Sequence, residues 1–134
     1  MKKITSFATA GILLLVTVIL LSNCKKEEDP IVPAFIVTAS TVPLQGGGDG
    51  LQFAAKCTND DVKLTKVLIT DPIQSPAITY NLNGTYFVKG EIFALQGTDE
   101  AYFKQIGTWK FQFVGNRTAD GASFAVDASL SVGK

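Results

Sequence analysis

The chain has 134 residues, 12 basic and 12 acidic side chains, a formal net charge of zero at pH 7 and no histidine. The lack of histidine excludes Ser-His-Asp and Cys-His catalysis, and it removes the commonest zinc ligand. Lys and Arg form no cluster after residue 33, so we expect no nucleic-acid partner.

Residues 1–23 have the pattern of a cleaved export signal. Met1-Lys2-Lys3 is a short cationic start, and a mostly apolar run from Phe7 to Leu21 follows it. The run is about 15 residues long, whereas a helix that crosses a bilayer core needs about 20. A cationic start, a short apolar run and a small residue before the break predict a secretory signal peptide rather than a retained membrane anchor.

The end of this signal carries a more specific pattern. Leu21-Ser22-Asn23-Cys24 resembles the lipobox of bacterial lipoproteins, in which an aliphatic residue stands three positions before an obligatory cysteine. The resemblance implies that Cys24 receives a diacylglyceryl group, that the signal is cleaved before it, and that the new amino terminus is acylated. Each buried methylene contributes about 0.8 kcal/mol, so two or three acyl chains, palmitate for example, anchor a protein stably. We expect no cofactor other than this lipid.

The lipidated cysteine opens a charged tether over residues 24–33. The run Lys25-Lys26-Glu27-Glu28-Asp29 resembles the surface-export signal of some Gram-negative lipoproteins, and Lys26, Glu27 and Glu28 match that pattern. The resemblance implies an outer-membrane protein that faces the cell exterior. The alternative is a solvated tether without an export role. Pro30 and Pro33 disfavour a helix in this segment.

Removal of the signal leaves 111 of the 134 residues, which suits one domain over residues 34–134. Lys2 and Lys3 leave with the signal, so the mature chain carries a net charge of about −2. With Cys24 lipidated, Cys57 has no partner and no intrachain disulfide forms. The mature domain therefore depends on its hydrophobic core.

The domain is expected to be all-β, because apolar and polar residues alternate along short segments and no helical period occurs. One such segment, Leu51 to Cys57, places the thiol on the inner face. In another, Val62 to Thr70, the alternation slips at Thr65-Lys66, which a β-bulge would correct. The expected strands lie near residues 35–39, 51–57, 62–70, 78–82, 86–88, 92–95, 109–113 and 124–132.

Two pairs of strands are expected to form hairpins. Asn83-Gly84 stands between two apolar runs, and both residue types accept the positive φ of a tight turn. Trp109, Phe111 and Phe113 alternate with Lys110 and Gln112, and a polar loop follows them. Phe124 to Val132 then alternates in the same way, so these last two segments are expected to pair.

About seven short strands in roughly 100 residues indicate an antiparallel β-sandwich. Gly107-Thr108-Trp109-Lys110-Phe111 resembles the start of the penultimate strand in immunoglobulin-like and fibronectin-type domains, with Trp109 where the corner tyrosine usually stands. The resemblance implies a single immunoglobulin-like sandwich like those of bacterial surface lipoproteins. Gly107-x-Trp109 also occurs in lipocalins, but too few residues follow it here to build an eight-stranded cup.

No set of residues in the domain predicts catalysis. Gly46 to Gly50 is interpreted as a flexible connection, because neither a helix nor a lysine follows it to complete a phosphate cradle. Asp49, Asp60 and Asp61 are weak candidates for a metal site at one end of the sandwich, and solvated turn acids are the favoured interpretation. We expect no catalytic residue and no bound metal.

The leading hypothesis is a lipid-anchored, non-catalytic envelope or surface lipoprotein that acts as a binding or structural module. Its expected contacts are the membrane, through the lipid on Cys24, and a protein or glycan partner. The alternative is a glycan-binding accessory protein or a small hydrolase that uses loop carboxylates such as Asp60 and Asp61. A third possibility is a lipocalin-like ligand carrier.

Overall fold

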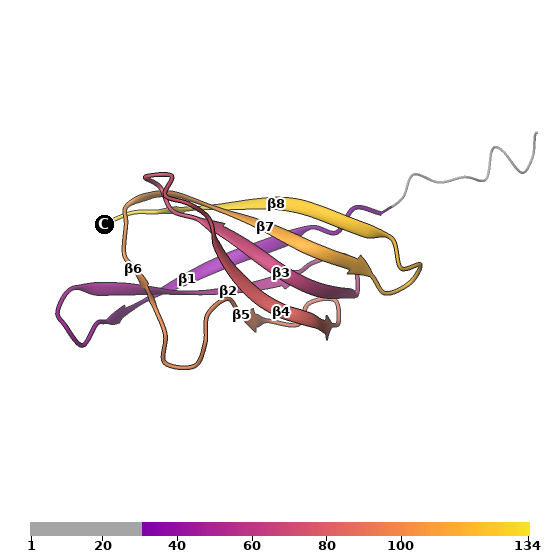
Figure 1. Ribbon diagram of the computed structural model, residues 1–134, viewed down its shortest axis with the longest axis horizontal. Helices are drawn as coiled ribbons and strands as arrows, with labels where there is room; N and C mark the ends of the chain where they lie inside the picture. The colour runs from indigo at the N-terminus through magenta and orange to yellow at the C-terminus, as the bar shows by residue number, and fades with distance from the viewer. Residues whose placement is uncertain (1–30) are drawn as a thin grey trace, which may run out of the picture. The chain divides into compact units, whose positions relative to one another are not determined.

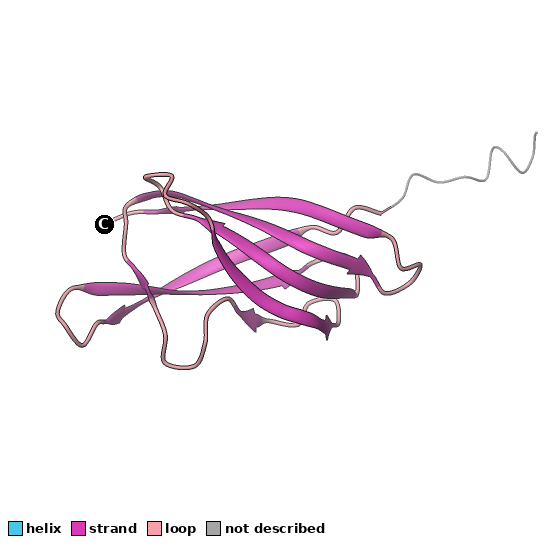
Figure 2. Cartoon of the chain, in the orientation of Figure 1, coloured by secondary structure: helices cyan, strands magenta, loops and turns pink. Residues whose placement is uncertain are grey.

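The computed structural model describes residues 31–134, which contain eight β-strands and no helix (Figures 1 and 2). The expectations for the signal peptide, the lipobox and most of the tether fall outside the described residues. Residues Val32–Lys134 form one compact unit. The strands are β1 (Phe35–Pro43), β2 (Asp49–Cys57), β3 (Val62–Thr70), β4 (Ile78–Phe87), β5 (Phe93–Ala94), β6 (Tyr102–Phe103), β7 (Gly107–Arg117) and β8 (Ser123–Val132).

The strands form two antiparallel sheets that pack face to face. Sheet A has the order β1-β2-β5, with β6 also paired to β2, and sheet B has the order β4-β3-β7-β8. Figure 1 shows β3, β4, β7 and β8 as one layer and β1 and β2 as the other. The expected all-β, antiparallel sandwich is therefore confirmed. The sheets keep separate edges and do not close into a lipocalin-like cup.

The two short strands β5 and β6 are parts of one interrupted edge strand beside β2. Between them the chain leaves the sheet, and a side chain takes over the pairing. The backbone N–H of Phe53 donates to Oε1 of Gln96 at 2.8 Å, while the N–H of Leu95 donates to the carbonyl of Phe53 at 3.0 Å. Gln96 thus supplies an acceptor that the main chain would provide in a continuous strand.

The hydrophobic core lies between the inner faces of the two sheets. Aromatic rings cross this interface: Phe35 of β1 stacks on Phe113 of β7 with centroids 4.0 Å apart, and Phe53 of β2 meets Phe111 of β7 edge-on at 5.0 Å. Such pairs add to the free energy of apolar burial. The buried apolar residues are Val37, Leu51, Phe53, Ala55, Cys57, Val62, Leu64, Val67, Ile69, Phe87, Phe93, Leu95, Trp109, Phe111 and Phe113.

The expected bulge in β3 is present. Leu64 pairs with Gly115 and Lys66 pairs with Val114, so Thr65 is an extra residue relative to β7. This shift keeps Leu64 and Val67 on the buried face, as the alternation requires.

The expected hairpin at Asn83-Gly84 is wrong. Both residues have positive φ, 54° and 75°, but they lie within β4, which runs from Ile78 to Phe87. They bulge opposite the extra residue of β3, because Asn81 pairs with Lys66 and Thr85 pairs with Leu64. A dipeptide that tolerates positive φ suits a bulge as well as a tight turn.

The two ends of the sandwich differ in their connection to the rest of the chain. We call one end the tether pole; it comprises residues 32–34, 58–61, 88–92 and 118–122. The opposite end, the distal pole, comprises residues 44–48, 71–77, 104–106 and 133–134. Figure 1 shows the start of β1 at one end and the C-terminus at the other.

Candidate functional site

Most residues of the predicted site fall outside the described part of the chain. These are the lipobox residues Leu21, Ser22 and Asn23, the lipidation site Cys24, and the export-signal residues Lys26, Glu27 and Glu28. Their roles stay predictions. The structure describes the place where the chain that carries them enters the sandwich.

Asn59 fixes this entry point. Its amide Nδ2 donates to the carbonyl of Val32 at 2.9 Å, and its Oδ1 accepts from the N–H of Ala34 at 2.9 Å. The two bonds flank Pro33, which is buried. The N–H of Thr58 also donates to the carbonyl of Ala34 at 2.9 Å. The chain is thus held to the domain from Val32 onward.

The three candidate metal-binding aspartates do not come together. Asp49 begins β2 at the distal pole, whereas Asp60 and Asp61 follow the end of β2 at the tether pole. Asp49 is the first residue of the nine-residue strand β2, and Asp60 and Asp61 lie beyond its last residue. The length of the strand puts about 25 Å between Asp49 and the other two aspartates. In the described residues, no group of three or more His, Cys, Asp or Glu side chains is placed to hold a metal ion.

Asp60 takes part in an ion-pair network with Arg117, the single arginine of the chain. The Nε of Arg117 donates to Oδ2 of Asp60 at 2.6 Å, and its Nη1 donates to Oδ2 of Asp120 at 2.6 Å. The hydrogen bond to Asp60 raises the pKa of Arg117, with a further contribution from the charge of Asp120. The network joins the β2–β3 connection to the β7–β8 loop.

Asp61 is held by the main chain of two other segments. Its Oδ1 accepts from the N–H of Lys89 at 2.7 Å, and its carbonyl accepts from the N–H of Thr118 at 3.2 Å. Asp60 therefore binds the end of β7, and Asp61 binds two other segments of the tether pole. This arrangement gives them a structural role and disfavours them as the carboxylate pair of a hydrolase.

Cys57, the last residue of β2, is a buried free thiol on the inner face, as the alternation predicted. Its Sγ lies 3.6 Å from Oδ1 of Asn59, the residue that holds the entering chain. A buried thiol in apolar surroundings is inert toward nucleophilic chemistry. Cys57 therefore belongs to the core.

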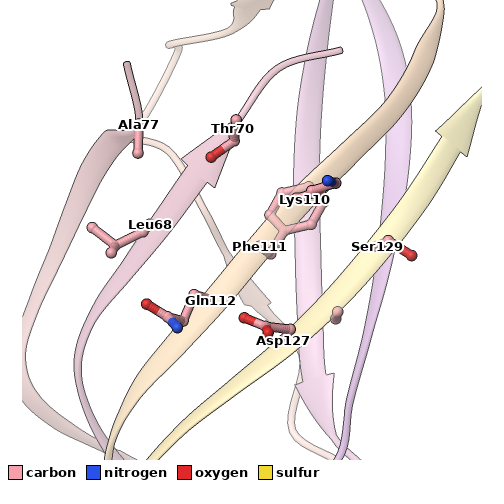
Figure 3. Close-up of a pocket in the computed structure, with 9 residues that line it drawn as sticks. Leu68, Thr70, Ala77, Lys110, Phe111, Gln112, Asp127 and Ser129 are labelled. Atoms are coloured by element: carbon pink, nitrogen blue, oxygen red, sulfur yellow. The ribbon is translucent and has the colours of Figure 1, made fainter. Parts of the chain in front are cut away.

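A hollow lined by the oppositely charged residues Lys110 and Asp127 lies on the outer face of sheet B (Figure 3). It has a volume of about 550 Å³ and spans β3, β7 and β8, with Ala77 of the β3–β4 connection at its margin. Register explains its lining, because Gln112 pairs with both Leu68 and Asp127, and Lys110 pairs with both Thr70 and Ser129. Lys110 and Asp127 are thus diagonal neighbours on adjacent strands.

The polar side chains that line this hollow can form hydrogen bonds with a ligand. Lys110 donates hydrogen bonds, Asp127 accepts them, and Gln112 does both. Its lining contains no exposed aromatic ring on which a sugar would stack. The alternation along each strand predicts outward positions for Lys110, Gln112 and Asp127. It does not predict that the three side chains lie near one another, because their proximity depends on the register between strands.

Trp109, expected at the position of a corner tyrosine, closes the turn before β7. Its Nε1 donates to the carbonyl of Gln105, four residues earlier, at 3.0 Å. The Nε2 of Gln105 donates in turn to Oδ2 of Asp71 at 3.1 Å. A hydrogen bond from the N–H of Ser75 lowers the pKa of Asp71. These bonds hold the distal pole together.

Residues 31–134 contain no helix with the length and apolarity that a membrane crossing requires. Comparisons of the chain with protein-family models, with curated protein sequences and with solved structures found no match. A functional assignment therefore depends on the chain's own residues and their geometry.

Proposed function

We propose that this protein is a lipid-anchored, non-catalytic lipoprotein of the outer membrane, in which one immunoglobulin-like domain binds or positions a partner at the cell surface. The observation that carries the proposal is the spacing at the N-terminus: a cationic start, a short apolar run and Leu21-Ser22-Asn23-Cys24. Lipid on Cys24 supplies the membrane attachment. Lys26, Glu27 and Glu28 support export to the surface.

The immunoglobulin-like assignment is supported by strand order. In such domains the third, penultimate and last principal strands are neighbours in one sheet, and the first two pair in the other. Here β3, β7 and β8 are neighbours in that order, and β1 pairs with β2. The indole of Trp109 bonds to an upstream carbonyl, as a corner tyrosine does.

The position of the domain relative to the anchor also supports the proposal. The compact unit begins at Val32, eight residues after Cys24. Asn59 binds the main chain on both sides of Pro33, so a load on the anchor is transmitted directly to the β2–β3 connection. The absence of histidine from the sequence supports a binding role over a catalytic one.

Replacement of Cys24 tests the anchor. Cys24→Ser should abolish incorporation of radiolabelled palmitate and should release the protein from the membrane fraction, because serine has no thiol to accept the diacylglyceryl group. Globomycin, which blocks the lipoprotein signal peptidase, should make the uncleaved precursor accumulate. Antibody labelling of intact cells reports whether the domain faces the exterior.

Cys57→Ala is the matched control, because Cys24 and Cys57 are the two cysteines of the chain. The Cys57→Ala protein should keep both the palmitate label and the membrane attachment. A Cys24→Ser protein that stayed in the membrane fraction with an unchanged label would refute the proposed anchor.

A further inference from the structure

Three large aliphatic side chains form one exposed surface near the tether pole. Val32, Ile36 and Ile92 are 63%, 51% and 69% exposed. Val32 and Ile36 line one shallow hollow beside β8, and Ile36 and Ile92 line a second one over Ala54. Ile36 therefore connects the other two. We call Val32, Ile36 and Ile92 the tether-end patch.

The fold explains why the patch faces solvent. Ile36 lies between Phe35 and Val37, whose side chains pack toward the core, so it points from the outer face of sheet A. It pairs across the strands with Lys56. Ile92 follows a turn that is bonded to the end of β2, since the N–H of Gly90 donates to the carbonyl of Cys57 at 2.8 Å. A single exposed aliphatic side chain is ordinary, whereas three that adjoin one another form a candidate contact surface.

The length of the preceding chain indicates what this surface meets. Val32 lies eight residues after Cys24, and eight fully extended residues span at most about 28 Å. A bilayer that holds the lipid on Cys24 is therefore within reach of the patch. Attachment through so short a segment gives the patch and the membrane a local concentration of about millimolar, so a weak surface affinity suffices for contact.

We propose that the tether-end patch rests on the surface of the bilayer that carries the Cys24 lipid and directs the distal pole away from it. The inference depends on the lipid anchor proposed above. Val32, Ile36 and Ile92 enter the boundary between headgroups and acyl chains, as apolar side chains of peripheral proteins do. Lys56, beside Ile36, extends its ammonium to lipid phosphates while its methylene stem covers apolar surface.

Paramagnetic broadening tests this contact. The mature lipidated chain, labelled with ¹⁵N, is placed in nanodiscs of phosphatidylethanolamine and phosphatidylglycerol that contain a lipid with a nitroxide headgroup. Amide signals of residues 36 and 92 should lose at least about twofold more intensity than that of residue 73. Ile73 is the matched reference, because it is 74% exposed at the distal pole.

A second arm of the experiment tests the membrane contact independently of natural lipidation at Cys24. Cys57 is buried, so a mature chain made without lipid can be coupled through the Cys24 thiol to a maleimide lipid in the same nanodiscs. The broadening at residues 36 and 92 should recur. The double variant Ile36→Ser, Ile92→Ser should lose this preference in both arms, whereas Ile73→Ser should keep it.

The outcomes distinguish the two proposals. Unmodified Cys24 in the mass spectrum of protein from cells would overturn the anchor, and the maleimide arm would still decide the contact. Equal broadening at residues 36, 73 and 92 in the maleimide arm would overturn the contact, whatever the state of Cys24 in cells. A patch that serves a protein partner instead would give this second result.

Discussion

Two tyrosine side chains hold the segment that leaves sheet A between β5 and β6. The phenol of Tyr102 donates to the carbonyl of Leu95 at 2.5 Å, and that of Tyr80 donates to the carbonyl of Gln96 at 3.2 Å. Burial raises the pKa of Tyr102 to about 12, with smaller contributions from Tyr80 and Glu100. One residue thus combines a hydrogen bond with a pH-dependent contribution to stability.

Tyr102→Phe should lower the free energy of unfolding by about 1 kcal/mol near neutral pH, because the carbonyl of Leu95 loses its donor. The raised pKa gives the sign of the pH dependence. The unfolded phenol titrates near pH 10 and the folded one near pH 12, so this stabilisation is complete below pH 10 and is lost as the pH rises through about 12. Urea unfolding at about pH 8 and about pH 11 measures both effects.

Tyr86→Phe is the control for this experiment, since Tyr86 lies 46% exposed on β4. Its stability should follow that of the unmodified chain at both pH values. If Tyr102→Phe lost as much stability between the two pH values as the unmodified chain, the assignment of this alkaline loss to Tyr102 would be wrong.

At the scale of strands, the bulge in β3 depends on its neighbours on both sides. On one side Gly115 of β7 lies against the main chain, and a Cβ at that position would be 2.1 Å from the carbonyl oxygen of Lys63. On the other side Asn83 and Gly84 accommodate the extra residue with positive φ. The bulge is therefore encoded in three strands, although only β3 shows the slip in alternation.

Gly115→Ala should lower the free energy of unfolding by more than about 2 kcal/mol, because the new methyl group forces β3 and β7 apart in a packed sheet. Gly46→Ala is the matched control: its Cβ would meet nothing within 4 Å, and its effect should stay within about 0.5 kcal/mol. Thermal unfolding of a chain that begins at Cys24 measures both. An unchanged midpoint for Gly115→Ala would show that the two strands are not in close contact there.

At the scale of the whole molecule, both sheets contribute to one core. Cys57 on sheet A and Trp109 on sheet B are each buried, and aromatic pairs such as Phe53 with Trp109, at 5.0 Å, cross between the sheets. Neither sheet can separate without exposing the inner face of the other. Small domains of this kind unfold in a single cooperative step.

Two intrinsic probes test this cooperativity. Thiol reactivity of Cys57 and fluorescence of Trp109, the single tryptophan of the chain, should report the same urea midpoint, because exposure of either requires loss of the shared core. The Cys24→Ser protein is used, so that only one thiol reacts. If Cys57 reacted well before the fluorescence changed, sheet A would open independently of sheet B.

The sequence correctly predicts the features that depend on local interactions and fails where the feature depends on a distant strand. Alternation correctly placed Cys57 on the inner face, paired β7 with β8 and located the bulge at Thr65. These features depend on side-chain direction along a single strand. Asn83-Gly84 predicts a hairpin by its local pattern, whereas the choice between a turn and a bulge depends on which strand lies opposite.

The sequence by itself determined the all-β class and the position of Cys57 on the inner face of its strand, because periodicity and composition are local properties. Tertiary structure decided which side chains meet. It separated Asp49 from Asp60 along β2, joined Asp60 to Arg117, and placed Lys110 diagonally across from Asp127. It also gathered Val32, Ile36 and Ile92 on one surface. The physical reason is that proximity between strands depends on their order and register, which no single segment encodes.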